Sequence, residues 1–505
     1  MAAFITSNLI GLLAKTLTAR YFGTTIESGA FFAANRFSEI LFSLVAGGAL
    51  GSAFIPVFTG MLVNKNYQKA WKLASSIINI VTIILVLLSI LTILFSKSVV
   101  RYVLAPGFDS VQIELTARLL RIQVLSSVIF GMSGILMAIL NSYQHFFLPA
   151  IAPAMYQIGW IFGIVVLSPG MGIDGLAWGV VIGAGLHLAI KIPQMLSLDG
   201  RSYSFGLGLW MDEVKEVARL MAPRLLGVAV VQLNFLLNTF LASFQQEGAI
   251  TAISLAFPLM IMPQAAIAQS IAIAALPTFS ALVAKGDMEE MQRTLASTLR
   301  AVILLAIPAS VGLVVLRTPI VQLLYGSNMF DTNSVDLVAW ALLWYAIGLL
   351  GHGVVEITSR AFYSLHDTRT PVAIGVGAMV MNLGLSLFFT FLFNRINWMP
   401  HGGLALANSM ATAIESVILL ILMKKKLKGI AAPKIFDAAW KAMIASLTMV
   451  FVIVLIERTI MRQSILAGTV LSIFFGTISY FCVLVILKTS EVKRAAALIW
   501  AKLTK

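Results

Sequence analysis

Residues 141–149 read Asn-Ser-Tyr-Gln-His-Phe-Phe-Leu-Pro and residues 363–371 read Tyr-Ser-Leu-His-Asp-Thr-Arg-Thr-Pro, so a serine and a proline return with the same spacing 222 positions later. Two more pairs recur in the same order, at offsets of 221 and 228 positions: Pro56-Val57-Phe58-Thr59 with Pro277-Thr278-Phe279-Ser280, and Gly175-Leu176-Ala177 with Gly403-Leu404-Ala405. Three ordered matches at nearly one offset indicate an internal duplication. Many transporters are duplicated bundles of membrane helices with a cavity between the halves.

The composition indicates a polytopic membrane protein. Hydrophobic residues make up 59% of the 505 positions and charged residues 11%, more apolar surface than a soluble protein of this length can bury. The single cysteine, Cys482, excludes a disulfide within the chain. The first apolar run begins at Ala2 and lacks the basic region and cleavage site of a signal peptide.

We predict an all-α polytopic fold with about fourteen transmembrane helices, because each apolar stretch is long enough to cross about 30 Å of hydrocarbon. The stretches are 2–22, 29–62, 71–96, 117–142, 149–168, 174–195, 220–245, 250–283, 298–316, 335–362, 371–394, 402–423, 440–457 and 463–487.

The duplication divides these helices into domains. An N-terminal six-helix lobe is predicted over 1–200 and a C-terminal six-helix lobe over 220–430, followed by two extra helices and a tail over 431–505. Segment 201–219 links the lobes, and its residues 206–219 have the pattern of an interfacial amphipathic helix. Six is an even number, so the two repeats are expected to insert in the same orientation.

The charges of the loops predict the orientation. Alternating loops on the side of the C-terminus hold 24 Lys and Arg and 10 Asp and Glu residues, whereas the opposite loops hold 9 basic and 8 acidic residues. The positive-inside rule places the first set and both termini in the cytoplasm. The net charge of +14 therefore reflects topology and contact with anionic lipids, for example at 424–428, and no nucleic-acid partner is expected.

Once the loop charges, which include those at the ends of the apolar stretches, are set aside, five charged residues remain inside the membrane segments: Lys15, Arg36, Glu39, Glu356 and Glu415. Charges at that depth are costly and mark a cavity or a partner. His187 and His352 are neutral candidates in the same segments. Arg36 and Glu39 lie three positions apart on one helix face. They form either a structural ion pair or part of a cavity in which Arg36 engages an anionic group. Lys15 is a second cation for that cavity, or its side chain extends to the interface.

Two further acids are candidates for ion coupling. Glu356 lies four positions before Arg360, the spacing of an ordinary ion pair, and Glu415 is either a proton or ion ligand or a hydrogen-bond partner for a neighbouring helix. Uncharged polar residues are expected to line the central cavity or to bond between helices: Asn8, Asn35, Gln232, Asn234 and Gln264. The chain lacks a Walker A loop, a dinucleotide fingerprint, zinc-ligand spacing and a nucleophile elbow, so we expect no enzyme activity, metal or cofactor.

The chain resembles the MurJ/MviN family of lipid II flippases, within the multidrug/oligosaccharidyl-lipid/polysaccharide exporter superfamily. The most specific stretch is 360–372, Arg-Ala-Phe-Tyr-Ser-Leu-His-Asp-Thr-Arg-Thr-Pro-Val. Other similar segments are Ala19-Arg20-Tyr21-Phe22-Gly23, Gly48-Ala49 to Ala53-Phe54-Ile55-Pro56, Ala105-Pro106-Gly107-Phe108, Ile139-Leu140-Asn141-Ser142 with 149–153, and Leu226-Gly227 with Gln232 and Asn238.

The resemblance implies a monomer in the bacterial inner membrane that moves an undecaprenyl-diphosphate-linked precursor from the cytoplasmic to the outer leaflet by alternating access. It also implies a central cationic cavity for the diphosphate, because fixed positive charge in a low dielectric favours phosphate. No cofactor is implied, although coupling to the membrane potential, Na⁺ or H⁺ is open.

This chain departs from the family pattern in its cavity charges. Family arginines correspond to Asn8 and to Ala14 or Lys15, and a family acid corresponds to Gly29. At five further positions where family members usually carry a charge, this chain has an uncharged residue: Phe42, Gly47, Phe257, Pro258 and Ile261. The expected cavity therefore rests on Lys15 and Arg36. Alternatives are a cation-coupled exporter of another lipid-linked or amphipathic substrate, and a scaffold without transport activity.

Overall fold

The computed structural model describes residues 2–45, 49–461, 464–489 and 491 of the chain. The described residues form helices joined by turns, without a β-strand, which confirms the predicted all-α class. Within the described residues, ten helices are long and apolar enough to cross a membrane, or up to twelve when each of two bent pairs counts as one span. The polytopic character is thereby confirmed, and the count of fourteen stays a prediction. Gly47 lies outside the described residues.

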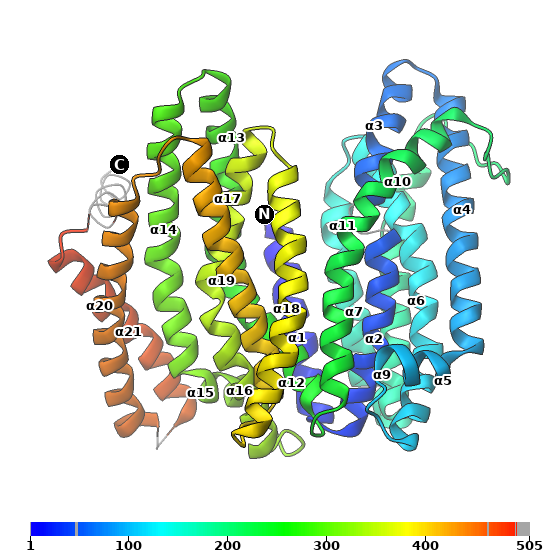
Figure 1. The fold of residues 1–505 in the computed structure, drawn as a ribbon. Coiled ribbons are helices and arrows are strands. Elements are labelled where there is room, and N and C mark those ends of the chain that lie inside the picture. Colours follow the sequence, from blue (N-terminus) through cyan, green and yellow to red (C-terminus); the bar gives the residue numbers. More distant parts are fainter. Residues whose placement is uncertain (1, 46–48, 462–463, 490, 492–505) are drawn as a thin grey trace. The chain divides into compact units, whose positions relative to one another are not determined.

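One compact unit comprises Met1–Thr251 with Ser327–Asp331. Its helix α6 packs against α2, α4 and α9, while α7 packs against α1 and α9, and α11 packs against α2 and α3 (Figure 1). The elements are α1 (Ala2–Phe22), α2 (Ile26–Val45), α3 (Ala49–Val63), α4 (Tyr67–Leu94), α5 (Ser96–Val99), η1 (Val100–Leu104), α6 (Ser110–Ser142), α7 (Phe147–Phe162), η2 (Gly163–Leu167), α8 (Ser168–Met171), α9 (Ile173–Ala189), α10 (Ile192–Leu196) and α11 (Asp212–Ser243).

The other unit comprises Ala252–Gly326 and Thr332–Lys505. In it α19 packs against α16, α17 and α18, and the C-terminal helices α20 and α21 pack against each other, with α20 also against α14 (Figure 1). The elements are α12 (Ala249–Gln264), which begins in the first unit, η3 (Ala265–Gln269), α13 (Ser270–Ala284), α14 (Met288–Val315), α15 (Arg317–Tyr325), α16 (Thr332–Ile347), α17 (Leu349–Ser364), α18 (Arg369–Arg395), α19 (His401–Lys426), α20 (Ala432–Ile456), η4 (Glu457–Met461) and α21 (Ile465–Ile486).

The repeated sequence around the serine and the proline forms the same turn twice. After α6, the backbone N–H of His145 donates to Leu140 O and Gln144 has a φ of 64°. After α17, the N–H of Asp367 donates to Phe362 O and His366 has a φ of 59°. These helix ends, each closed by a residue in the left-handed region, occupy equivalent positions of the repeat. The next helix then begins two residues before the shared proline, at Phe147 and at Arg369. The matching Ser–Pro spacing therefore corresponds to the same turn in both places, a turn that also ends other helices of the chain, for example at Lys65 and Asn397.

The linker differs from the prediction. No separate amphipathic helix covers 206–219: residues 201–211 are not helical, and α11 begins at Asp212 and continues into its apolar part. Asn79 of α4 holds the linker by donating to Ser204 O at 2.9 Å and to Gly206 O at 3.1 Å. Carboxylates in the first turn of α11 favour its N-terminus, and Glu213 forms an ion pair with Lys69. The compact units divide after Thr251, and the lobe boundaries taken from the repeat stay a prediction.

Glycines bring α7 and α9 into close contact. A Cβ atom on Gly159 would lie 2.2 Å from the Gly183 Cα, and one on Gly163 would lie 2.6 Å from the Gly179 Cα. Side chains at these positions would force the helices apart, so small residues set the helix spacing, as in many membrane bundles. This contact fixes Tyr156 of α7 and His187 of α9 on opposite sides of the candidate site described next.

Candidate functional site

Glu39 is the centre of a polar cluster on α2. Its Oε2 accepts a hydrogen bond from Arg36 Nη1 at 2.6 Å, and its Oε1 accepts one from Asn35 Nδ2 at 2.9 Å. Spacings of three and four residues place these groups on one face of the helix. The predicted i,i+3 ion pair therefore forms, and the Glu39 side chain remains 45% exposed.

Arg36 also contacts α11. Its guanidinium carbon lies 5.2 Å from the centroid of the Phe235 ring, within the range of a cation–π interaction. The Arg36 Nε is buried and has no hydrogen-bond partner among the described residues. An arginine with an unused donor can bind an incoming anion, and the planar fork of donors in its guanidinium suits phosphate.

Lys15 of α1 is the second cation near this cluster, after Arg36. It is half-buried, interacts electrostatically with Glu39 and Arg36, and makes no hydrogen bond or ion pair within the described part of the chain. Asn8, two turns earlier on α1, is exposed. On α11, Gln232 and Asn234 are half-buried just before Phe235. Within the first unit, the structure thus brings Lys15, Asn35, Arg36 and Glu39 together.

A cavity of about 260 Å³ lies beside this cluster, inside the first unit. Its polar wall consists of Asn35, Ser38 and Glu39 of α2, Ser126 of α6, Tyr156 of α7 and His187 of α9. Phe42, Phe130 and Pro153 complete its apolar wall. A concave, mostly apolar site with a few polar groups is the usual form of a ligand pocket.

A buried network that includes His187 and Lys191 adjoins the cavity. His187 Nδ1 lies 2.7 Å from Ser133 Oγ and 3.4 Å from Lys191 Nζ, and Lys191 also donates to Ser133 O at 2.7 Å. Ser133 Oγ in turn donates to His187 O at 3.1 Å, so the network joins α6 to the end of α9. His187 is a neutral candidate from the sequence, whereas Lys191, counted with the loop charges, is fully buried.

The second unit holds the remaining candidates. Gln264 ends α12 and is half-buried. Glu356 accepts from Arg360 Nη2 at 2.9 Å, so the predicted i,i+4 pair forms. Glu415 of α19 is half-buried, and its Oε1 lies 3.4 Å from the position that a Cβ on Gly375 of α18 would take. It has no hydrogen-bond or ionic partner among the described residues. The structure therefore does not join these three residues into one cluster.

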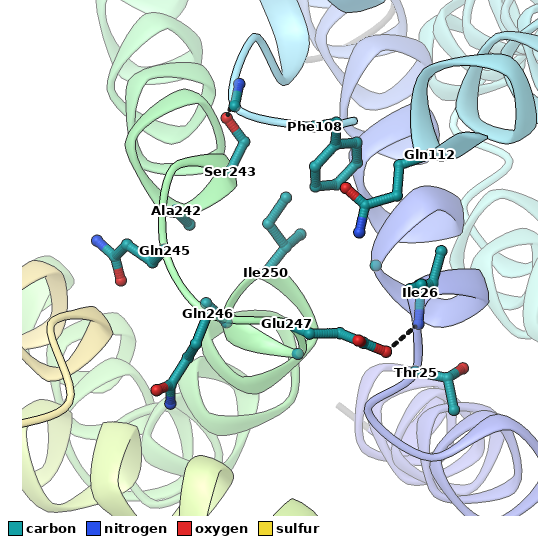
Figure 2. A pocket seen from close by; sticks show the side chains of 14 residues that line it. Thr25, Ile26, Phe108, Gln112, Ala242, Ser243, Gln245, Gln246, Glu247 and Ile250 are labelled. Atoms are coloured by element: carbon teal, nitrogen blue, oxygen red, sulfur yellow. Dashed lines mark hydrogen bonds between the residues drawn. The ribbon is translucent and has the colours of Figure 1, made fainter. Parts of the chain in front are cut away.

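A smaller pocket of about 70 Å³ surrounds the start of α2, and Gly29 is among the residues that line it. Figure 2 shows Glu247, from the turn between α11 and α12, pointing at the backbone of Ile26; its Oε1 accepts from Ile26 N at 3.0 Å. On the other side of the pocket, Gly107 N donates to Ser243 Oγ at 3.1 Å. A carboxylate at a helix N-terminus is stabilising. The hydrogen bonds of Glu247 and Ser243 therefore attach the end of α11 and the turn that follows it to Ile26 and Gly107 of the same unit.

Neither a metal centre nor a disulfide emerges in the part of the chain that the structure describes. Those residues contain no group of three or more His, Cys, Asp or Glu side chains that could hold a metal ion, and Cys482 is free and exposed. The candidate site therefore provides positive charge, one partly exposed carboxylate and several hydrogen-bond donors around a cavity.

Known proteins are similar to this chain in sequence and in fold over most of their length. A curated protein of Bdellovibrio bacteriovorus, named probable lipid II flippase MurJ, is 28% identical, covering 97% of this chain and 94% of its own. A protein of Burkholderia cenocepacia, named lipid II flippase MurJ, is 29% identical over 85% of this chain and 82% of its own length. A protein of Vibrio cholerae, named probable lipid II flippase MurJ, is 30% identical over 83% of this chain and 80% of its own length.

Solved structures agree. One described as lipid II flippase MurJ in an inward closed conformation superposes with a TM-score of 0.83 at 26% identity, covering 97% of this chain and 99% of that one. An inward-facing multidrug transporter of the MATE family reaches a TM-score of 0.71 at 15% identity, over 83% of this chain and 94% of that one, which shows a shared fold. The protein-family model described as lipid II flippase MurJ matches residues 18–480. This chain therefore belongs to the lipid II flippase MurJ family.

Proposed function

We propose that this protein moves lipid II, the lipid-linked peptidoglycan precursor, from the cytoplasmic to the outer leaflet by alternating access. Family membership supports the substrate class. The observation that carries the proposal is the pair of cations, Lys15 and Arg36, which lie close together on α1 and α2 of the first unit. A diphosphate needs such charges, since its desolvation in a low dielectric is costly without them.

The geometry of Arg36 supports a role in binding the diphosphate. The guanidinium carbon lies 5.2 Å from the centroid of the Phe235 ring, and the buried Nε has no hydrogen-bond partner among the described residues. Lys15, on the neighbouring helix, has an ammonium group without a hydrogen-bond partner in the described residues. Two fixed cations match the two charges of a diphosphate diester, and Asn8, Gln232, Asn234 and Gln264 are proposed to bind its sugar portion.

The orientation and the energy source are part of the proposal. The excess of basic residues in alternate loops supports cytoplasmic termini and a bacterial inner membrane. Coupling to the membrane potential, Na⁺ or H⁺ would use a membrane-embedded acid. Glu415, half-buried and without a partner among the described residues, fits that role better than Glu356, which is paired with Arg360. We propose a monomer as the working unit.

Complementation tests this function directly. In a bacterium depleted of its essential lipid II flippase, the wild-type chain should restore growth, and Arg36→Ala and Lys15→Ala should impair it. Arg101→Ala, which removes an exposed arginine far along the chain from both cations, is the matched control and should rescue fully. A wild-type chain that reaches the membrane and does not rescue would contradict the proposal. Rescue by all three variants would contradict the role of the cations.

A further inference from the structure

The Arg36–Glu39 pair lies between two different environments. On one side Arg36 contacts Phe235 and keeps its Nε without a partner among the described residues. On the other side Glu39 lines the 260 Å³ cavity. The two residues therefore hold each other in place. Arg36 could in addition bind an anion, and Glu39 could interact with molecules inside the cavity.

The cavity is suited to hold water. Ser38 Oγ, on its wall, is buried and has no hydrogen-bond partner among the described residues. The same is true of both amide atoms of Gln123, which is fully buried one turn before Ser126 on α6. Buried polar groups of this kind are normally satisfied by internal water, which takes up about 30 Å³ per molecule. Several water molecules therefore fit beside Glu39.

We propose that binding of a diphosphate displaces Glu39 from Arg36, and that the freed carboxylate then takes up one proton from the water of the cavity. The inference rests on the proposed function, and it adds a ligand, the proton, and a residue that binds it. In this exchange the Arg36–Glu39 ion pair breaks and an Arg36–phosphate pair forms. A hydronium in the cavity gives its proton to a Glu39 oxygen and becomes water, so charge and atoms balance.

Electrostatics favour the exchange. Before binding, Lys15 and Arg36 face the single charge of Glu39, so the cluster carries one net positive charge. A diphosphate diester adds two negative charges, and the cluster becomes neutral only if Glu39 is protonated. An uncompensated charge in a low dielectric is strongly unfavourable. The proton is therefore taken up on binding and released when Glu39 pairs with Arg36 again.

The groups around Glu39 are consistent with this assignment. The titratable or charged residues that face it are Lys15 of α1, Arg36 of α2, Tyr156 of α7 and His187 of α9, with Lys191 behind His187. From α6 and α11, the neighbours are Ser126, Phe130 and Phe235, which do not titrate. Asn35 holds the other carboxylate oxygen in both states, because its amide donates equally to a carboxylate and to a neutral carboxyl carbonyl.

Calorimetry tests the proposal on the purified full-length protein. The ligand is lipid II with a shortened prenyl chain, whose phosphates stay singly charged near neutral pH. Titrations in two buffers of different protonation enthalpy count the protons bound. We expect the wild type to take up close to one proton per ligand, and its affinity to rise by up to about tenfold for each unit that the pH falls within the transition.

Matched variants identify the residue. Glu39→Gln should bind at least as tightly, without proton uptake and without the pH dependence, because the competing carboxylate is gone. Glu39→Asp should retain the uptake, which separates titration from packing. Asp174→Asn removes a carboxylate from another ion pair of the same unit, whose Arg118 Nε lies 3.2 Å from Asp174 Oδ1, and should behave as wild type.

The outcomes separate this inference from the function on which it rests. Binding by the wild type without proton uptake, or uptake that persists in Glu39→Gln, would overturn the inference and leave the flippase proposal intact. Failure of the wild-type protein to bind the ligand at all would overturn both.

Discussion

Glu39 and Lys191 show how the same bundle treats two buried charges differently. Glu39 is neutralised by an adjacent arginine and stays partly exposed at a cavity. Lys191 is fully buried, and its hydrogen-bond partners are a backbone carbonyl and a histidine nitrogen. A buried ammonium without a carboxylate is costly. Its two hydrogen-bond partners therefore compensate only part of the cost of burying Lys191.

Asp367, in the turn between α17 and α18, provides a test of pH dependence at a single residue. Its hydrogen bond from Lys426 Nζ, at 2.5 Å, is the main cause that holds its pKa at about 2, below the ordinary 3.8; bonds from Thr370 add to this. The folded-state pKa is depressed, so the stabilisation is complete above 3.8 and is lost as the pH falls toward 2.

Asp367→Asn should therefore lower the thermal midpoint of the purified protein at neutral pH. The difference from wild type should shrink as the pH falls from about 4 to about 2. Thermal unfolding followed across this range measures both midpoints. Asp437→Asn, which removes an exposed i,i+4 partner of Lys441, is the control and should have little effect, because such pairs contribute about 0.3–0.5 kcal/mol. A constant difference at every pH would refute the assignment.

Some residues of the site are predictable from sequence and others are not. Arg36 and Glu39 stand out because a charge in the middle of an apolar helix has few explanations. Lys191 was counted with the loop charges because it lies near the end of an apolar stretch, where a lysine side chain normally reaches the interface. Its burial depends on α6 lying against it, through Ser133, and that contact joins positions 58 residues apart.

At the level of elements, the contact of α7 with α9 depends on glycine. A Cβ on Gly183 would lie 2.4 Å from the Tyr156 carbonyl oxygen, whereas Gly185 of the same helix has open space around it. Gly183→Ala should therefore destabilise the protein by about 1–3 kcal/mol, as overpacking does, and Gly185→Ala should be neutral or slightly stabilising. Thermal unfolding of both variants measures this. Equal midpoints would show that α7 and α9 separate without cost.

Helices and their ends follow from sequence better than linkers do. Long apolar runs and the repeated Ser–Pro spacing predict the helices and the turns at 143–146 and 365–368, because these depend on neighbouring residues. The linker was predicted wrongly as a separate amphipathic helix. Its backbone instead bonds to Asn79, more than 120 residues earlier, and an amphipathic pattern alone contains no information about such a distant partner.

For the whole molecule, the duplication and the distribution of charge have different consequences. The duplication predicts two related bundles, and the turns at Gln144 and His366, at matching positions of the repeat, are consistent with it. The chemistry is unequal: Lys15 and Arg36 belong to the first repeat, whereas Glu356 and Glu415 belong to the second. We therefore propose different roles for the two halves, anion binding for the first and ion coupling for the second.

The orientation of the molecule in the membrane is the last prediction, and the single cysteine makes it simple to test. In a Cys482→Ser background, Asn66→Cys places a thiol in a basic loop and Gln246→Cys places one in an opposite loop; both positions are exposed. The excess of basic residues predicts that the Asn66 loop is cytoplasmic. In intact cells an impermeant maleimide should label Gln246→Cys, and label Asn66→Cys only after the membrane is permeabilised. Labelling in the reverse pattern would show that the topology is inverted, and the proposed direction of transport would then be reversed as well.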